Sequence, residues 1–250
     1  MTAMRFDVLT LFPEMIISAA GYGITGRAQE RGIVALSAWN PRDYTVDKHR
    51  TVDDRPYGGG PGMVMKYQPL HEALTAARQA GSGAAKVVYL SPQGKPITQA
   101  LLTEACEASQ LILVAGRYEG VDERFVELDC DDEWSIGDYV ISGGELAALV
   151  VIDAITRLLP GVLGDEESAQ QDSYMNGLLD CPHFTRPEQV NGVAVPDVLL
   201  KGNHSEIERW RMKQALGRTW QRRPDLLKKK ELTTEQEKLL KEFINQVELD

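Results

Sequence analysis

The stretch KVVYLSPQGKPITQALLTEACEASQLILVA, residues 86–115, decides the fold class. Its two ends, Lys86–Leu90 and Leu111–Ala115, are short, apolar and rich in β-branched residues, which is typical of buried strands. Between them, Thr98–Ser109 has helical spacing. A strand, a helix and a second strand in this order predict two parallel strands joined by a crossover helix.

The sequence before and after this stretch continues the alternation. Arg5–Leu11 and Ile33–Trp39 have the composition of strands, and Gln68–Ala80 has helical spacing. Ser142–Leu159 is apolar nearly all round, so we expect a helix buried on most sides, in a core or a subunit interface. The first 160 residues therefore predict an α/β domain with a mostly parallel sheet.

The composition changes after Pro160. Residues 161–176 are mostly polar, acidic and aperiodic, which is typical of a linker. We therefore expect one domain over 1–160, a flexible interdomain linker over 161–176 and a small, mainly helical domain over 177–250. Two pairs with capping-box spacing predict helix starts in that last part: Ser205 with Glu208, and Thr234 with Glu237.

Composition excludes several classes of protein. The chain has 250 residues, of which 43% are hydrophobic and 26% charged, which excludes a disordered chain. No apolar run reaches the ~18 residues of a membrane span, and the N-terminus lacks a secretory leader. Three widely spaced cysteines argue against a disulfide framework. We expect a cytoplasmic protein.

The charge is unevenly distributed. The net charge of −10 at first argues against a nucleic-acid partner. However, residues 201–250 carry 12 Lys and Arg against 9 Asp and Glu, and residues 209–230 hold nine basic residues and one acid, Asp225. This asymmetry indicates an anionic partner, although a solvated helix face would give the same pattern.

Two glycine-rich stretches need separate interpretations. Gly21–Gly26 matches G-x-G-x-x-G, but a dinucleotide site requires that pattern directly between a strand and its helix. Here it follows Pro13–Ala20, which looks helical, so a helix-ending turn is favoured. Asp54–Met63 (DRPYGGGPGM) lacks the lysine of a phosphate loop, and its bare backbone would let a flat ligand approach closely. A flexible loop without a ligand is the alternative.

Three further segments place glycine and polar residues after predicted strands: Ser91–Gly94, Gly116–Gly120 and Ser135–Glu145. Ligands of parallel sheets bind outside the carboxyl ends of the strands, so these segments predict one shared pocket. Three ordinary turns would be the alternative. The four histidines have no metal-ligand spacing, and Cys181-Pro182-His183 is too compact, so we do not expect a zinc site.

Ten sequence words then match a known family. After TLFPEM (Thr10–Met15) come, in order from Asp54 to Trp220, DRPYGGGPGM, YLSPQG, GRYEG, DEWSIGDYVISGGE, PGVLG, DSY, GLLDCPHFTRP, GNH and RWR…LGRTW. Over nearly its whole length the chain closely resembles the bacterial tRNA (guanine-37-N1)-methyltransferases of the SPOUT class. The resemblance implies a deep trefoil knot in the parallel α/β domain and a homodimer whose active sites are shared between subunits. It also implies methyl transfer from S-adenosylmethionine to N1 of guanosine 37 in the tRNA anticodon loop.

The resemblance also assigns the methyl donor to the three segments after the strands. Its candidate cofactor residues are Tyr89, Leu90, Ser91, Pro92, Gly116, Arg117, Tyr118, Glu119, Gly120, Ser135, Ile136, Gly137, Tyr139, Ile141, Gly143 and Gly144. Glu119 is in addition a candidate Mg²⁺ ligand, because a carboxylate is a ligand type that Mg²⁺ prefers. The sequence itself shows no metal cluster.

The same resemblance names two catalytic residues. Guanine N1 carries a proton at neutral pH, so a base must remove it, and Asp172 in the linker matches the family's base. Arg157 matches the residue that stabilises the negative charge on O6. Without the resemblance, Asp172 would be one acid among several in the linker, and Arg157 would be an ordinary cation at the C-terminal end of a helix. Expected tRNA contacts are Arg55, Gly59, Gly60, Pro61, Gly62, Arg218 and Arg222.

Two other functions are compatible with parts of this sequence. A different enzyme of the same class would methylate another RNA, although DSY and DRPYGGGPGM argue against it. A non-catalytic RNA-binding module would not need three loops for a nucleoside.

Overall fold

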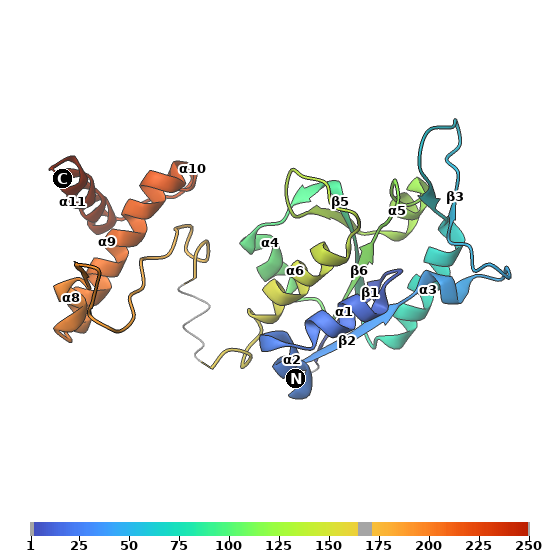
Figure 1. Ribbon diagram of the computed structural model, residues 1–250, viewed down its shortest axis with the longest axis horizontal. Coiled ribbons are helices and arrows are strands. Elements are labelled where there is room, and N and C mark those ends of the chain that lie inside the picture. The colour runs from blue at the N-terminus through green and yellow to red at the C-terminus, as the bar shows by residue number, and fades with distance from the viewer. Residues whose placement is uncertain (1–2, 165–171, 250) are drawn as a thin grey trace. The chain divides into compact units, whose positions relative to one another are not determined.

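The computed structural model describes residues 3–164 and 172–249. The chain divides into two compact units, Met1–Gly164 and Asp165–Asp250 (Figure 1). The expected linker, 161–176, spans the boundary, and its residues 165–171 lie outside the described part. In the described part of the chain, no helix is both long enough and apolar enough to cross a membrane.

A five-stranded parallel sheet forms the centre of the N-terminal unit. Its strands are β1 (Met4–Leu9), β2 (Val34–Trp39), β5 (Ala85–Pro96), β6 (Gln110–Ala115) and β7 (Asp132–Ser135). They lie in the order β2-β1-β6-β5-β7, and each neighbouring pair is parallel. The parallel α/β domain expected from the sequence is therefore confirmed.

Helices cover both faces of this sheet (Figure 1). The alternation of side chains along a strand supplies an apolar surface to each face. Val88 and Leu90 belong to one hydrophobic cluster, whereas Val87 and Tyr89 belong to the other. The first cluster includes residues of α1 (Pro13–Ala20), α2 (Gly23–Glu30), α4 (Gln99–Ala105) and α6 (Glu145–Thr156). The second includes residues of α3 (Tyr67–Ala80) and α5 (Glu123–Asp129), and the 3₁₀ helix Pro41–Tyr44 packs on α3.

Strand β5 is longer than the sequence predicts. The segment Ser91–Gly94, expected as a loop after the strand, lies inside β5. Leu90 and Lys95 are both paired with Trp134 of β7, so the residues between them form a bulge. Gly94 is needed there, because a Cβ on it would lie 2.5 Å from the backbone nitrogen of Trp134. A bulge of this kind depends on the neighbouring strand and redirects the side chains beside it.

The glycine run Gly21–Gly26 contains the expected helix-ending turn at Gly21, but its last four residues belong to a second helix, α2, which the sequence did not predict. Helix α1 ends at its cap residue Gly21, and α2 begins at Gly23, whose φ of +64° is left-handed. No strand precedes the run directly, so the requirement for a dinucleotide site is not met.

The C-terminal unit is mainly helical. A small hairpin of β8 (Gln189–Val190) and β9 (Val193–Ala194) precedes α8 (Asp197–Leu200), α9 (His204–Arg222), α10 (Pro224–Leu227) and α11 (Thr234–Leu249). Leu178, Leu216 and Leu239 form its core. Helices α9 and α11 approach closely at Gly217, whose missing side chain leaves room for the ring of Phe243.

The helix starts of this unit differ from those expected. Asn203, rather than Ser205, caps α9, and its side chain accepts a hydrogen bond from the Glu206 amide. A capping box does open α11, but Thr233 and Gln236 form it by reciprocal hydrogen bonds. In both places a neighbouring residue with equal capping ability occupies the cap.

Candidate active site

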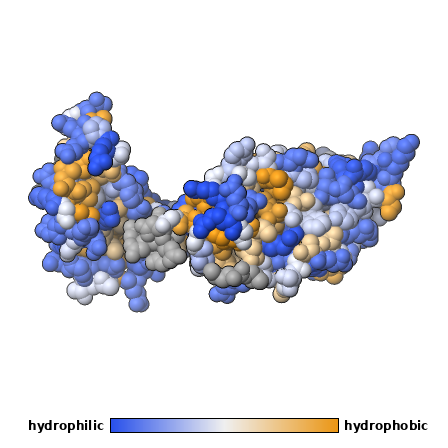
Figure 2. Space-filling model, turned by 90° about the horizontal axis from the view of Figure 1, so that it is seen from below, coloured by the Kyte–Doolittle hydropathy of each residue, from blue (hydrophilic) through white to orange (hydrophobic). Residues whose placement is uncertain are grey.

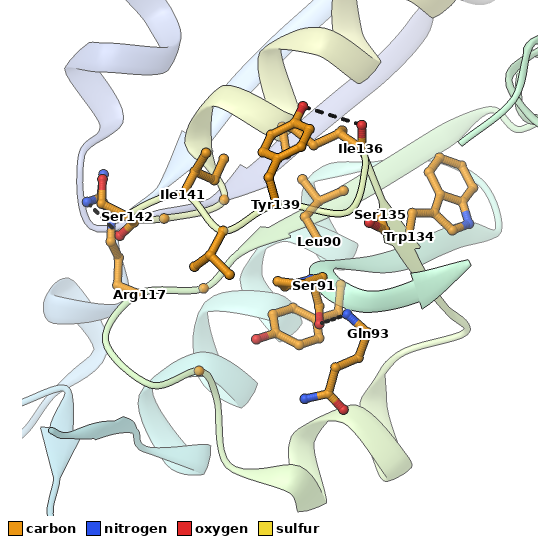
Figure 3. Close-up of a pocket in the computed structure, with 18 of the residues that line it drawn as sticks. Leu90, Ser91, Gln93, Arg117, Trp134, Ser135, Ile136, Tyr139, Ile141 and Ser142 are labelled. Carbon is orange, nitrogen blue, oxygen red and sulfur yellow. Dashed lines mark hydrogen bonds between the residues drawn. The ribbon is translucent and has the colours of Figure 1, made fainter. Parts of the chain in front are cut away.

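One cavity of about 290 Å³ lies beside the carboxyl ends of β5, β6 and β7. The β5 bulge, the loop after β6 and the loop after β7 all contribute to its wall (Figure 3). All the residues that the resemblance assigns to the methyl donor line this cavity. Gln93, Val140 and Ser142 also line it and belong to the segments that were predicted to form the pocket. Sequence reasoning missed two further lining residues, Trp134 and Ala147.

The loop after β7 forms a compact turn over the cavity. The Ser135 hydroxyl accepts a hydrogen bond from the Gly137 amide at 3.2 Å. The Tyr139 hydroxyl donates to the Ile136 carbonyl at 3.4 Å, as the dashed line in Figure 3 shows. The ring of Tyr139 is thereby fixed near the apolar side chains of Leu90 and Ile141. This surface suits the face of a flat aromatic ring such as an adenine base.

A buried carboxylate, that of Glu145, connects the loop after β6 with the end of the loop after β7. Glu145, in the first turn of α6, is fully buried. It accepts a hydrogen bond from the Thr10 hydroxyl at 2.8 Å and one from Nε of Arg117 at 2.9 Å. Arg117 also donates to the Ser142 carbonyl at 3.1 Å, and its guanidinium lies over the ring of Phe12. The loops after β6 and β7 are thus held to each other and to the end of β1.

Two glycines permit the close approach of these loops. A Cβ on Gly144 would lie 2.6 Å from the Cα of Ala115, and a Cβ on Gly143 would collide with the Arg117 side chain. The Gly144 amide donates to the Gly116 carbonyl at 3.0 Å. Only glycine fits at these positions without displacing the backbone of β6 or the guanidinium. The two glycines therefore allow the loops after β6 and β7 to pack directly against each other at the edge of the cavity.

The loop after β6 has a strained backbone. Tyr118 has a φ of +61°, and Gly120 has a φ of +126°. Left-handed geometry is unusual for a tyrosine, and such outliers cluster at binding sites. The neighbouring Tyr89 is largely buried beneath Gly116 and Gly120, and this burial, with Glu133 nearby, raises its pKa to about 12. Its phenol therefore remains neutral at physiological pH.

The glycine-rich segment Asp54–Met63 forms a hairpin beside this loop. Strands β3 (Asp53–Asp54) and β4 (Val64–Met65) pair at its base, and four glycines in its tip have positive φ values. The Glu119 amide donates to the Met63 carbonyl at 2.9 Å, and the Met65 amide donates to the Gly120 carbonyl at 2.9 Å. Gly62 lies directly against the Glu119 carboxylate. An expected substrate loop therefore meets an expected cofactor loop.

The remaining predicted residues lie at helix ends or in the other unit. Arg157 is half-buried and is the C-terminal cap residue of α6. Asp172 is half-buried in the C-terminal unit, where its carbonyl accepts a hydrogen bond from the Met175 amide. Arg218 and Arg222 lie on α9. The neighbouring acids Asp165, Glu166 and Glu167 lie outside the described residues.

Three potential metal ligands meet near the start of the C-terminal unit, where their spacing had argued against a site. Asp180, Cys181 and His183 each place one ligand atom within 4.8 Å of the others. Asp180 is already hydrogen-bonded to Nε2 of His183 at 2.8 Å. Burial opposes ionisation of Asp180, but this bond holds its pKa below the usual range. This hydrogen bond by itself accounts for the closeness of Asp180 and His183.

Comparisons with known proteins agree on one family. The sequence pattern of the family described as "tRNA (Guanine-1)-methyltransferase TrmD" matches residues 4–229. A tRNA (guanine-N(1)-)-methyltransferase from Tolumonas auensis is 60% identical over 244 residues, which cover 98% of each chain. One from Pseudomonas putida is 61% identical over 243 residues, or 97% of each chain. Because the family pattern covers most of the chain and these relatives are about 60% identical to it, the chain belongs to the tRNA (guanine-1)-methyltransferase family.

Proposed function

We propose that this protein transfers a methyl group from S-adenosylmethionine to N1 of guanosine 37 in tRNA. One observation carries the proposal: the expected cofactor residues line a single cavity at the carboxyl ends of parallel strands, in a chain about 60% identical to tRNA (guanine-N(1)-)-methyltransferases. The close approach of the loops at Gly143 and Gly144 shapes this cavity, and the apolar surface near Tyr139 fits a nucleoside.

Asp172 acts as the general base in this proposal. S-adenosylmethionine supplies the methyl group and leaves as S-adenosylhomocysteine. Guanine N1 gains the methyl group and loses its proton, which the Asp172 carboxylate accepts. Loss of that proton shifts negative charge towards O6, where the Arg157 guanidinium stabilises it. The electron pair of the broken N–H bond stays on N1 and forms the new bond to the methyl carbon, while the electron pair of the broken sulfur–methyl bond stays on sulfur. The methylated guanine is therefore neutral.

Glu119 would hold Mg²⁺ if the reaction uses it. Its carboxylate lines the cavity and lies against Gly62, so an oxygen ligand stands between the cofactor loop and the hairpin. The same contact supports binding of the tRNA at Arg55 and Gly59–Gly62, because the hairpin tip is exposed beside the cavity.

A homodimer completes the proposed enzyme. Helices α1 and α6 pack together, and Ile17, Leu146 and Val150 on them are each about half exposed. Figure 2 shows hydrophobic side chains at the surface of this unit. Such apolar side chains on adjacent helices favour contact with a second copy. Each active site would then combine the cavity of one protomer with Asp172 of its partner. A trefoil knot is consistent with the return of the chain from β7 to Gly116 at the end of β6.

Methyl transfer to defined RNA tests the proposal. The enzyme is incubated with S-adenosylmethionine labelled in the methyl group and a tRNA transcript carrying guanosine at position 37. We expect 1-methylguanosine in the digested product and no label in the matched transcript with adenosine 37. Label in both transcripts would indicate another target nucleotide. Tight tRNA binding without cofactor binding or transfer would indicate a non-catalytic RNA-binding module.

A further inference from the structure

A second cavity lies wholly within the C-terminal unit. It has a volume of about 550 Å³, and the segment 182–188, α8 and the first half of α9 line it. None of the catalytic or cofactor residues discussed above belongs to it. Two aromatic residues, Phe184 and Trp210, and two arginines, Arg186 and Arg211, contribute to its wall. We refer to this cavity as the α9 groove.

The aromatic pair in the α9 groove leaves one ring face for a planar ligand. The ring centroids of Phe184 and Trp210 are 6.3 Å apart, and their planes are inclined by 54°. A base inserted between two rings requires them to be nearly parallel, so this geometry favours stacking on one ring. Phe184 is 45% exposed although its ring lies beside that of Trp210, so the pair leaves aromatic surface open to solvent in the groove.

The charges around the groove favour an anion. The groove is lined by two arginines, Arg186 and Arg211, and by one acid, Glu188, so the lining residues themselves carry a positive excess. A second acid, Asp180, lies outside the lining and faces His183. His183 is held in place by its hydrogen bond to Asp180. An aromatic face next to guanidinium groups is the combination that binds a nucleotide, with the ring under the base and the arginines at the phosphate.

The groove continues along one face of α9. Ile207, Trp210 and Arg211 stand at helical spacing i, i+3 and i+4, so they share a face. Arg218 and Arg222 follow seven and eleven residues after Arg211, on the same face, about 10 and 16 Å further along the helix. The opposite face packs on α11, as the ion pair between Arg209 and Glu242 shows. The positive residues therefore form a track that leads out of the groove.

We propose that the α9 groove binds one unpaired nucleotide of the tRNA, with its base stacked on Trp210 and its phosphate at Arg186 and Arg211. The neighbouring phosphates of the strand lie along Arg218 and Arg222. Unpaired nucleotides are the parts of an RNA that proteins read by stacking. The inference rests on the proposed function for the identity of the RNA, but it concerns a site apart from the target base.

Binding measurements on the full chain test the proposal. Trp210→Ala should raise the Kd for the guanosine-37 transcript roughly 5- to 100-fold, the effect of losing one stacked base. Trp210→Phe keeps a ring and should restore most of the affinity. Tryptophan fluorescence should fall when the transcript is added to the wild type, and fall less with Trp210→Phe. Cofactor affinity should not change, because the groove lies in the other unit.

Trp220→Ala is the matched control. Trp220 is 38% exposed on the same helix but lies outside the groove, so its loss should leave the Kd for the transcript unchanged. If Trp210→Ala fails to fold, Phe184→Ala and Arg211→Glu carry the test, since both side chains are exposed.

Equal tRNA affinity of the groove variants and Trp220→Ala would overturn the inference. The inference would also be overturned if the groove variants changed the molecular mass of the protein in solution but not its affinity for the transcript. That result would show that the groove is a contact between copies of this chain. The proposed function fails separately: it is wrong if the wild type does not methylate the transcript, whatever the groove variants bind.

Discussion

The Arg117 guanidinium and the Glu145 carboxylate form an ion pair with an N–O distance of 2.8 Å, which joins the loop after β6 to the first turn of α6. Glu145 is fully buried, while Arg117 retains a fifth of its side-chain exposure. The Thr10 hydroxyl binds the other carboxylate oxygen. Two walls of the cavity therefore depend on one buried charge.

Replacing Glu145 by glutamine should destabilise the N-terminal unit. The neutral amide cannot balance the Arg117 charge, and we expect a loss of about 2 to 3 kcal/mol in the free energy of unfolding, because Arg117 keeps some contact with water. Urea denaturation followed by circular dichroism measures it. Arg124→Gln, which breaks the more exposed pair with Asp122, is the control and should leave the unfolding midpoint nearly unchanged. Equal effects of the two changes would mean that the buried pair has no special role.

Tyr89 should make stability depend on alkaline pH. Burial raises its pKa to about 12 in the folded protein, above the ordinary value of 10.0. Between these two values the unfolded chain releases the proton and the folded chain retains it, so stability falls as the pH rises. We expect Tyr89→Phe to lose less stability than the wild type between pH 10 and pH 12. Parallel pH profiles of the two proteins would show that Tyr89 ionises normally.

Asp172→Asn should slow methyl transfer itself. Asparagine keeps the size of the side chain but cannot accept a proton, so single-turnover transfer should fall by roughly 10²- to 10⁴-fold, with cofactor affinity nearly unchanged. The loss should diminish at alkaline pH, where guanine N1 releases its proton to solvent. Glu166→Gln and Glu167→Gln are the controls and should retain the rate. A similar loss in all three variants would show that the segment only orders the site.

Reversing two charges on α9 should weaken tRNA binding through phosphate contacts. Arg218→Glu with Arg222→Glu should raise the Kd for the transcript and reduce the slope of log affinity against log salt by about 1 to 2. Filter binding at several salt concentrations measures both. An unchanged slope would mean that this basic stretch is only a solvated face.

Much of the N-terminal fold follows from local patterns. Lys86–Leu90 and Leu111–Ala115 are apolar on both faces because helices cover both sides of the sheet, so their composition alone identifies them as buried strands. The β5 bulge could not be predicted, since the double pairing of Trp134 is a property of β7 rather than of the residues 91–94 themselves.

The sequence predicted the loops of the site but not the buried residues behind them. Glycine and polar residues after strands indicate the loops, because strand ends meet at one edge. Trp134 and Ala147 line the cavity from elements whose apolar residues look like ordinary core. The Thr10–Glu145 hydrogen bond joins residues 135 positions apart, and no spacing in the sequence predicts such a contact. The choice of Asp172 among several acids likewise came from family resemblance, because its neighbours have the same chemistry.

The central proposal is that the cavity at the ends of β5, β6 and β7 binds the methyl donor. A crystal structure with S-adenosylhomocysteine measures this without ambiguity. We predict density for the ligand in contact with Tyr89–Gly94, Gly116–Gly120 and Ile136–Gly144 together, with Gly143 and Gly144 against it. Density at the Gly21–Gly26 turn instead, or an empty cavity at saturating ligand, would contradict the assignment.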